Sequence, residues 1–423
     1  MKGAAGRAPS LGEGRLAARA IGLGLAVALC GCAGARKEGP ILATVPLGRI
    51  SAVGRWPVLH LSGSPYEMGY QHGSMLRSRV RQSVANAIAF ADRQLGIPMM
   101  GRWVVRRKLD QAWRKMRPHV PDWYLEEMEG LADGAGISLR ALQRIHAVPD
   151  LTSVTCASFA AAGPATAEGR LIHARNLDWA IQSDVQEHAA LFVHHPKGRQ
   201  AFLSVGWLGF IGVISGINEI GISVGEIGAE TTEASLAGVP MPFLQRRILE
   251  EARDLREAVR IVESAPRTVG YNYLFADARQ KQAAALETTR DRCAVFWLDS
   301  EPQAPFSVPV PAAIFRSDFA LDAGVRERQL ASKGDPSQPG AESPVGSSAY
   351  DIRYRGQGLL LRQFSGRIDP EVAMAVTAAV APGSNIQSMV FAYPQMWVAT
   401  AEGRRPAARS VYQEVDLEEL FRR

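Results

Sequence analysis

The chain has 423 residues, 47% of them hydrophobic and 21% charged, so it is long enough to bury a sizeable core. Its 48 Lys and Arg residues exceed its 42 Asp and Glu residues by a net charge of +6, and the two signs are mixed, which excludes the concentrated basic surface of a nucleic-acid-binding protein. Four cysteines are too few for a disulfide scaffold, and without a Cys-x-x-Cys pair we expect no metal and no cofactor.

The first 35 residues have the pattern of a targeting segment. Two arginines precede an apolar run, 21–29, that is too short to cross a bilayer. The run ends in Leu-Cys-Gly-Cys, which resembles a bacterial lipoprotein signal with Cys32 as the lipid-bearing residue. Cleavage after Ala33 or Ala35, as in a secreted protein, is the alternative. Both predict an extracytoplasmic protein, and the first predicts attachment to an envelope membrane through the lipid anchor alone.

Residues 36–57 are interpreted as a linker, and residues 58–155 as a mainly helical segment that opens with a strand at 58–63. Ser-Pro-Tyr-Glu at 64–67 has the residue types of a capping box with a proline at the first helical position. Apolar residues then recur at helical spacing from about 82 to 148. We expect several helices before the first candidate site.

Two glycines and a histidine in this segment have alternative interpretations. Gly69 and Gly73 lie four residues apart on the predicted helix, where each costs about 1 kcal/mol, so we expect them to permit close packing against another element. His72, between them, is interpreted as a packing or surface residue, with a catalytic role as the alternative.

The main candidate site is a predicted hairpin that contains Cys156. An apolar strand follows Cys156, a Gly- and Pro-containing turn follows the strand, and a returning strand leads to Arg175 and Asp178. Arg175 and Asp178 are three positions apart, so in a regular strand their side chains face opposite sides of the sheet. If both serve one site, a bulge or a strand end must redirect one of them. The guanidinium would favour the thiolate, and the carboxylate can orient a protonated amine or hold the arginine. A buried structural Cys156, or a disulfide with Cys293, is the alternative.

The rest of the chain is predicted to alternate between groups of strands and groups of helices, which supports a mixed α+β fold. Two hairpins are expected first, the second turning at Asn218. Asn272 opens a later strand, and residues 300–348, rich in Pro, Ser and Gly, are interpreted as a long surface loop. Two helices and a final hairpin complete the prediction.

The sequence Thr155-Cys156-Ala157-Ser158-Phe159, followed by Arg175-Asn176-Leu177-Asp178-Trp179, resembles the C45 family of self-cleaving N-terminal-nucleophile hydrolases. This family includes proteins similar to acyl-coenzyme A:6-aminopenicillanate acyltransferase, and it is related to choloylglycine hydrolases and acid ceramidase. The resemblance extends from about His60 to about Tyr412. It implies a four-layer αββα sandwich, with residues 156–415 as the catalytic domain.

The resemblance also implies a mechanism with two stages. Cys156 attacks the Thr155 carbonyl and frees itself as a new amino terminus, whose α-amine then serves as the base for the thiol. Asp178 would orient the amine, Arg175 would stabilise the thiolate or bind substrate, and Asn272 would help to hold the oxyanion. The two processed chains are expected to stay associated.

Three further residues are candidates for substrate or oxyanion contacts. Arg353 and Arg355 compete for the position of an arginine that the family often has after a Ser-Ser pair, and a surface arginine is the default for either. Asn218 lies in a turn that matches the family, where its turn conformation is the simpler explanation.

The predicted function is therefore hydrolysis or transfer of an acyl group at a linear amide, with a small acyl-amide substrate. One alternative is a papain-type cysteine hydrolase, which would need a histidine such as His173 or His188 beside the thiol. The other is a non-catalytic envelope lipoprotein with the same fold.

Overall fold

The computed structural model describes residues 48–94, 101–152, 155–229, 231–300, 304, 307–329 and 349–422. The predicted targeting segment, with Cys32, lies outside the described residues. Among the helices of the described part, none combines the length and the apolar character that a membrane crossing requires.

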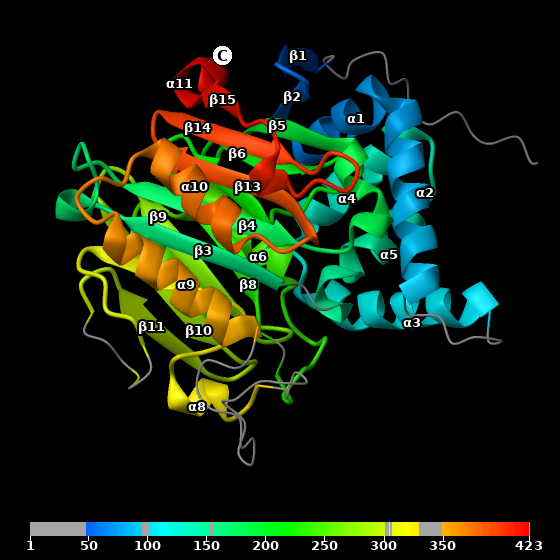
Figure 1. Cartoon of the computed structure of the whole chain (residues 1–423). Helices are drawn as coiled ribbons and strands as arrows, with labels where there is room; N and C mark the ends of the chain where they lie inside the picture. Colours follow the sequence, from blue (N-terminus) through cyan, green and yellow to red (C-terminus); the bar gives the residue numbers. More distant parts are fainter. Residues whose placement is uncertain are drawn as a thin grey trace, which may run out of the picture. The chain divides into compact units, whose positions relative to one another are not determined.

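Two β-sheets form the centre of the fold (Figure 1). The first has nine strands in the order β1-β2-β5-β6-β7-β8-β9-β10-β11, and the second has six in the order β12-β3-β4-β13-β14-β15. The strands are β1 (Arg49–Val53), β2 (Trp56–Gly63), β3 (Thr155–Ala161), β4 (Ile172–Asp178), β5 (Ala189–Pro196), β6 (Phe202–Trp207), β7 (Ser215–Asn218), β8 (Ile222–Gly228), β9 (Tyr271–Asp277), β10 (Gln282–Thr288), β11 (Cys293–Trp297), β12 (Ala313–Arg316), β13 (Asn385–Ala392), β14 (Gln395–Thr400) and β15 (Gln413–Asp416).

Among the described residues, the helices fall into three groups along the chain, one before β3, one between β8 and β9 and one before β13, with two short helices outside these groups. They are α1 (Pro65–Met75), α2 (Arg77–Gln94), α3 (Gly101–Met116), α4 (Asp122–Ala135), α5 (Leu139–Ala147), α6 (Met241–Glu251), α7 (Leu255–Ser264), α8 (Ala323–Arg326), α9 (Ala349–Gln363), α10 (Pro370–Val380) and α11 (Leu417–Phe421). The helical block expected over 82–148 and the capping box at Ser64 and Glu67 are both confirmed.

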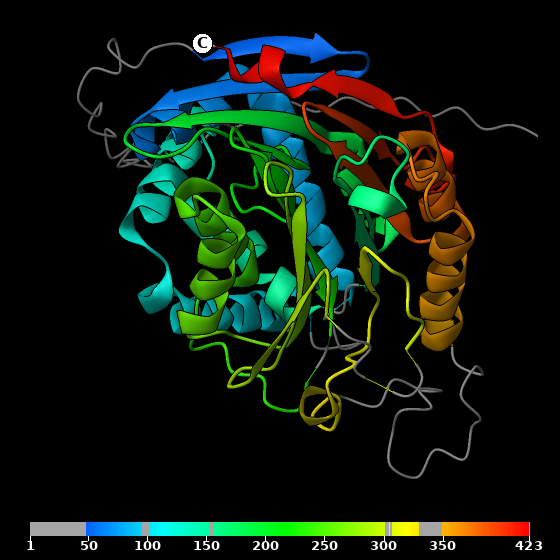
Figure 2. The same ribbon diagram turned by 90° about the vertical axis from the view of Figure 1, so that its left-hand side faces the viewer.

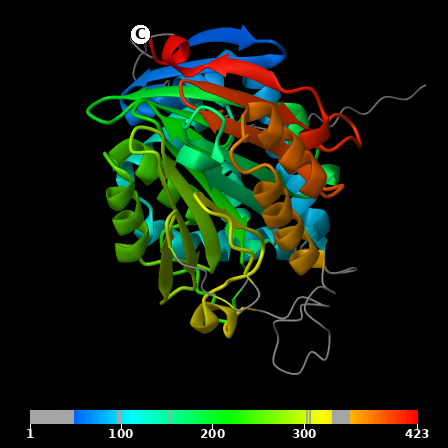
Figure 3. The ribbon, with the colours of Figure 1, turned by 60° about the vertical axis from the view of Figure 1, so that its left-hand side comes forward.

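The layer order follows from which side chains pack together. Alternate residues of one strand face opposite sides of its sheet, and in β5 Phe192 packs with the helices while Leu191 and Val193 pack between the sheets. The outer face of the nine-stranded sheet carries α1, α4, α6 and α7, and the outer face of the six-stranded sheet carries α9 and α10. Figures 2 and 3 show the strands between the green α6–α7 pair and the orange α9–α10 pair. The predicted αββα sandwich is confirmed.

Close packing of α1 on α4 depends on glycines of both helices. A Cβ on Gly69 would lie 2.0 Å from the backbone oxygen of Glu127, and a Cβ on Gly130 would lie 2.1 Å from that of Tyr66. A Cβ on Gly73 would meet backbone atoms of α4 at 2.5 Å. The interpretation of Gly69 and Gly73 as close-packing residues is therefore confirmed.

Two expectations from the sequence were wrong. β1 lies within the expected linker and pairs with β2. Residues 313–316, expected in a surface loop, form β12, whose side chains are buried and which pairs with β3. The high content of proline, serine and glycine at 300–348 made the short apolar strand β12 hard to predict. Residues 330–348 lie outside the described part of the chain.

Candidate active site

The expected hairpin around Cys156 is present as β3 and β4. Cys156 pairs with Leu177 and Ser158 pairs with Arg175, so Cys156 and Arg175 are diagonal neighbours on one face. Asp178 is the last residue of β4, opposite Thr155, where the register with β13 shifts. Because β4 ends here, the Asp178 side chain can depart from the alternation of the strand, as a site shared with Arg175 requires.

The Cys156 thiol lies between a guanidinium and a carboxylate. Arg175 donates a hydrogen bond from Nη2 to Cys156 Sγ at 3.3 Å, and the thiol donates to Glu226 Oε1 at 3.6 Å. Arg175 and Glu226 also form an ion pair at 3.4 Å, and their side chains are 0% and 1% exposed. Arg175 is therefore where the sequence analysis placed it, in contact with the sulfur.

Burial decides the protonation of this thiol. The pKa of Cys156 is raised well above its ordinary value, first by burial and then by the charge of Glu226, and the opposing effect of Arg175 is smaller. Burial also raises the pKa of Glu226. In the intact chain Cys156 is therefore a thiol with an acceptor beside it, and the thiolate expected from Arg175 alone is not favoured.

The backbone nitrogen of Cys156 contacts a different carboxylate from the one that contacts its sulfur. Asp318, in the loop after β12, accepts a hydrogen bond from the Cys156 N–H at 2.6 Å. Asp178, expected to orient the amine after cleavage, accepts from Asn385 Nδ2 at 2.9 Å in the intact chain and forms an ion pair with Arg353. Arg353 also reaches Asp318, with Nη1 3.4 Å from Oδ2. This places two carboxylates on one guanidinium directly behind Cys156.

Arg353 and Arg355 differ in burial and in their contacts. The Arg353 side chain is 10% exposed and also donates from Nε to the carbonyl of Val380 at 3.0 Å. Arg355, two residues along α9, is exposed and lies outside this network. Arg353 is the arginine that α9 contributes to the site.

The two candidate asparagines have backbone partners. Asn272 donates from Nδ2 to the carbonyls of Ser317 and Phe319 at 3.1 and 3.0 Å, which fixes the residues on either side of Asp318, and its Oδ1 is buried. An oxyanion contact by Asn272 remains a prediction. Asn218 accepts from Ile222 N at 2.8 Å and shapes its turn, away from Cys156.

Neither a disulfide to Cys293 nor a histidine partner is found for Cys156 among the described residues. Cys156 and Cys293 are both free thiols, so the disulfide is not formed. His173 hydrogen bonds to Ser158 and Ser223, and His188 to Asn86, and within the described ranges no histidine is hydrogen bonded to the sulfur. His72 accepts from Gly209 N at 2.9 Å and packs on Phe192. The thiol–histidine pair of a papain-type site is not observed in the described part.

Sequence reasoning missed Glu226 and Asp318. A lone carboxylate inside the apolar strand Ile222–Gly228 was a usable signal for Glu226, because a buried charge needs a partner. Asp318 had no such signal, since its contact with Cys156 depends on the pairing of β12 with β3.

A small apolar pocket lies beside the β3–β4 hairpin, although Cys156 itself does not line it. Leu177, the partner of Cys156, lines it, and so does Ile214, whose carbonyl accepts from Arg175. Its remaining lining is almost entirely apolar and comes from residues both before and after Cys156, namely Ser83, Ala87, Ile145, Val148, Pro149, Thr152, Trp179, Val185, Trp207, Leu208, Phe210 and Ile386. The space encloses about 70 Å³.

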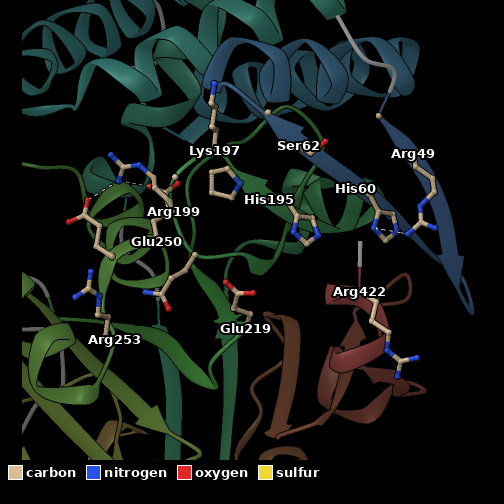
Figure 4. A pocket seen from close by; sticks show the side chains of 16 residues that line it. Arg49, His60, Ser62, His195, Lys197, Arg199, Glu219, Glu250, Arg253 and Arg422 are labelled. Carbon is tan, nitrogen blue, oxygen red and sulfur yellow. Dashed lines mark hydrogen bonds and ion pairs between the residues drawn. The ribbon is translucent and has the colours of Figure 1, made fainter.

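A larger cavity of about 1150 Å³ lies elsewhere and has a different character (Figure 4). Five cationic and three acidic side chains line it, including Lys197, Arg422 and Glu219. Glu219 lies in the turn before β8, whereas Glu226 lies towards the other end of that strand. None of the residues described around Cys156 lines this cavity.

The fold has four layers, Cys156 lies near the start of β3, and Arg175 contacts its sulfur. This combination is the one predicted for N-terminal-nucleophile hydrolases. The family model described as "Acyl-coenzyme A:6-aminopenicillanic acid acyl-transferase" matches residues 165–300. The predicted resemblance to this family is thereby confirmed.

Individual relatives are more distant. Protein dcd1B of Dictyostelium discoideum is 27% identical over 65% of this chain and 59% of its own length. The N-acylethanolamine-hydrolyzing acid amidase of Rattus norvegicus is 23% identical over 50% of this chain and 57% of its own. The chain therefore spans less than two thirds of these relatives. A solved Caenorhabditis elegans ortholog of that amidase has a TM-score of 0.42 and 17% identity over 56% of this chain and 92% of its own.

Proposed function

We propose that this protein is a self-cleaving cysteine hydrolase or acyltransferase that acts on a linear amide. The observation that carries the proposal is that both reactive atoms of Cys156 face charged groups: the sulfur lies on Arg175 and Glu226, and the nitrogen lies on Asp318. A structural cysteine needs none of these partners, and each of the buried charges is costly to maintain.

In the first stage, Cys156 Sγ attacks the carbonyl carbon of Thr155 and the thiol proton passes to Glu226. The carbon–nitrogen bond before Cys156 breaks, and a thioester joins Thr155 to the sulfur. Water then hydrolyses the thioester, which leaves a carboxylate on Thr155 and a free amine on Cys156. The raised pKa of Glu226 suits it to accept the proton.

In the second stage, the α-amine of Cys156 takes the thiol proton and the sulfur attacks the substrate carbonyl. Arg175 stabilises the negative charge that develops at the site, as expected of a buried guanidinium. Asp318 holds the amine, a role that its contact with the Cys156 nitrogen in the intact chain supports, and Asp178 acts indirectly by fixing Arg353.

The substrate's acyl group is proposed to be apolar. The pocket beside the β3–β4 hairpin is lined by aromatic and aliphatic side chains such as Trp207 and Phe210, and it has almost no polar surface with which to bind a sugar or a charged group. The rat relative is named for hydrolysis of N-acylethanolamines, which are linear amides of this type.

The two processed chains are proposed to remain one folded unit. β2, which precedes the break, pairs in parallel with β5, which follows it, from Val58 with Leu191 to Gly63 with Pro196. We also propose the extracytoplasmic, lipid-anchored location predicted from Cys32.

Intact mass spectrometry of the purified protein tests the proposal. We expect two fragments that separate before Cys156, an uncut chain for Cys156→Ala, and hydrolysis of a fluorogenic apolar acyl amide by the cut protein alone. A cut protein that leaves acyl amides of all chain lengths intact would contradict the enzymatic part. An intact protein with full amidase activity would contradict self-cleavage.

A further inference from the structure

The buried site has one more acid than base. Three carboxylates and two guanidiniums surround Cys156 in two groups: Glu226 pairs with Arg175, and Asp178 and Asp318 both pair with Arg353. All five side chains are buried or nearly so, with Arg353 the most exposed at 10%. An unpaired carboxylate away from water is costly, and such a group binds a proton to become neutral. In the intact chain, one of the three acids is therefore expected to be protonated.

Asp318 has the least cationic support of the three acids, so we expect it to carry the proton. Glu226 has Arg175 as its own ion-pair partner, and Asp178 has both Arg353 and Asn385. Asp318, at 3.4 Å, shares Arg353 with Asp178, which lies closer to that guanidinium.

The charged groups that face Asp318 come from several elements. Arg353 on α9 lowers its pKa together with the Cys156 N–H on β3, whereas Asp178 at the end of β4 and Glu226 on β8 raise it. Burial is the largest effect, and together they raise the pKa of Asp318 to about 7. Asn272, on β9, holds the backbone on both sides of the residue.

We propose that Asp318 is a catalytic residue of self-cleavage, the acid that protonates the leaving nitrogen of Cys156. Expulsion of an amide nitrogen requires a proton, because an amide anion is a poor leaving group. As Sγ bonds to the Thr155 carbon, that carbon becomes tetrahedral and the nitrogen regains its lone pair. The Asp318 carboxyl, whose Oδ1 lies 2.6 Å from this nitrogen, transfers its proton as the carbon–nitrogen bond breaks.

The protons balance over the whole step. The thiol gives one proton to Glu226, Asp318 gives one to the nitrogen, and the products are a thioester and an amine. Hydrolysis of the thioester consumes one water, whose two protons are released to solvent as the Thr155 carboxylate forms, and Glu226 returns its proton to the sulfur. When the amine then takes this proton from the thiol, it becomes a third cation among three carboxylates. Self-cleavage thus supplies the positive charge that the intact site lacks, and Asp318 changes from proton donor to partner of the new amino terminus.

This inference rests on the proposed self-cleavage, and the rate of cleavage as a function of pH tests it. Freshly refolded full-length precursor is followed by intact mass between pH 5 and pH 9, with Asp318→Asn as the variant. Asp322→Asn is the matched control. Asp322 lies on the same loop and caps α8, and asparagine is an equally good cap. The ion pair with Arg292 that the substitution removes is long at 3.9 Å and partly exposed to solvent.

We expect the wild-type rate to fall as the pH rises through about 7, where Asp318 loses its proton. Asp318→Asn should slow cleavage at least about 100-fold, the usual contribution of a general acid, and should remove that fall with pH. Asp322→Asn should match the wild type. Hydroxylamine, which cleaves thioesters, should not restore cleavage of Asp318→Asn, because the thioester is never formed.

Each contrary result has its own meaning. Cleavage of Asp318→Asn at the wild-type rate and with the wild-type pH profile overturns this inference while self-cleavage stands. Full rescue by hydroxylamine also overturns it, since Asp318 would then act on thioester hydrolysis. If Asp318→Asn shows no cooperative thermal unfolding, the variant is not folded and the pH profile of wild-type cleavage serves as the test. A wild-type cleavage rate that does not fall between pH 6 and pH 8 then overturns the inference. A wild-type chain that stays intact under all conditions overturns the proposed function itself.

Discussion

Arg353 on α9 and Asp178 at the end of β4 form a buried ion pair between residues 175 positions apart in the chain. The pair joins the outer helical layer to the inner face of the six-stranded sheet directly behind Cys156. Since Arg353 also reaches Asp318, one guanidinium neutralises parts of two carboxylates. The stability of the fold and the charge of the site are therefore coupled at this residue.

Arg353→Ala should destabilise the protein by about 3–5 kcal/mol, because it leaves buried carboxylates without their cation. Arg355→Ala removes an exposed arginine from the same helix and should change the free energy of unfolding by less than about 0.5 kcal/mol. Urea unfolding followed by circular dichroism measures both. Equal effects of the two substitutions would contradict the assignment of Arg353 to the site.

Glu226→Gln should have two effects of opposite direction. Self-cleavage should slow by about 100-fold or more, because the acceptor for the thiol proton is lost. At the same time the pKa of Cys156 should fall, because the charge of Glu226 helps to raise it, so iodoacetamide should alkylate the variant thiol at lower pH than in uncleaved wild-type protein. Glu219→Gln, in the exposed turn before β8, is the control and should change neither profile.

Glycine substitutions on two helices should change stability in opposite directions. Gly69→Ala should cost about 3 kcal/mol, because its methyl group would overlap the backbone of α4. Gly356→Ala, on α9, has open space around the new methyl group and should stabilise the protein by about 0.5–1 kcal/mol through its better helix propensity. Thermal unfolding of both variants compares them, and a neutral Gly69→Ala would show that α1 and α4 can separate without loss.

Acid should weaken the fold through His146. Its Nε2 accepts a hydrogen bond from Ile211 N at 3.0 Å, and burial, with a further effect of Arg246, lowers its pKa to about 4. The unfolded chain binds a proton at this residue below about pH 6.5 while the folded chain does not, so the stabilising effect is complete above pH 6.5 and decreases as the pH falls towards 4.

The loss from this one residue should be about 2 kcal/mol at pH 5. His146→Gln keeps an acceptor for Ile211 and removes the titration. The difference in unfolding free energy between wild type and variant should therefore change by about that amount between pH 8 and pH 5, measured by urea unfolding at each pH. A difference that stays constant with pH would contradict a neutral buried His146.

The sequence was informative wherever local chemistry determines structure. The capping box at Ser64, the close-packed Gly69 and Gly73 and the hairpin of Cys156 with Arg175 all depend on residues near one another in the chain, and all three are observed. The same reasoning failed for Asp318, because its position results from a strand pairing across about 150 residues. It also favoured a thiolate at Cys156, because an arginine is visible in a sequence and the burial that outweighs its charge is not.

The parallel pairing of β2 with β5 has a consequence for refolding after denaturation. In the intact chain, β2 and β5 find each other by intramolecular search. After the proposed self-cleavage they would belong to two polypeptides, and reassembly from denaturant would become a bimolecular reaction whose rate depends on protein concentration. The proposed cleavage would therefore leave folding unimpaired only if it follows closure of the nine-stranded sheet.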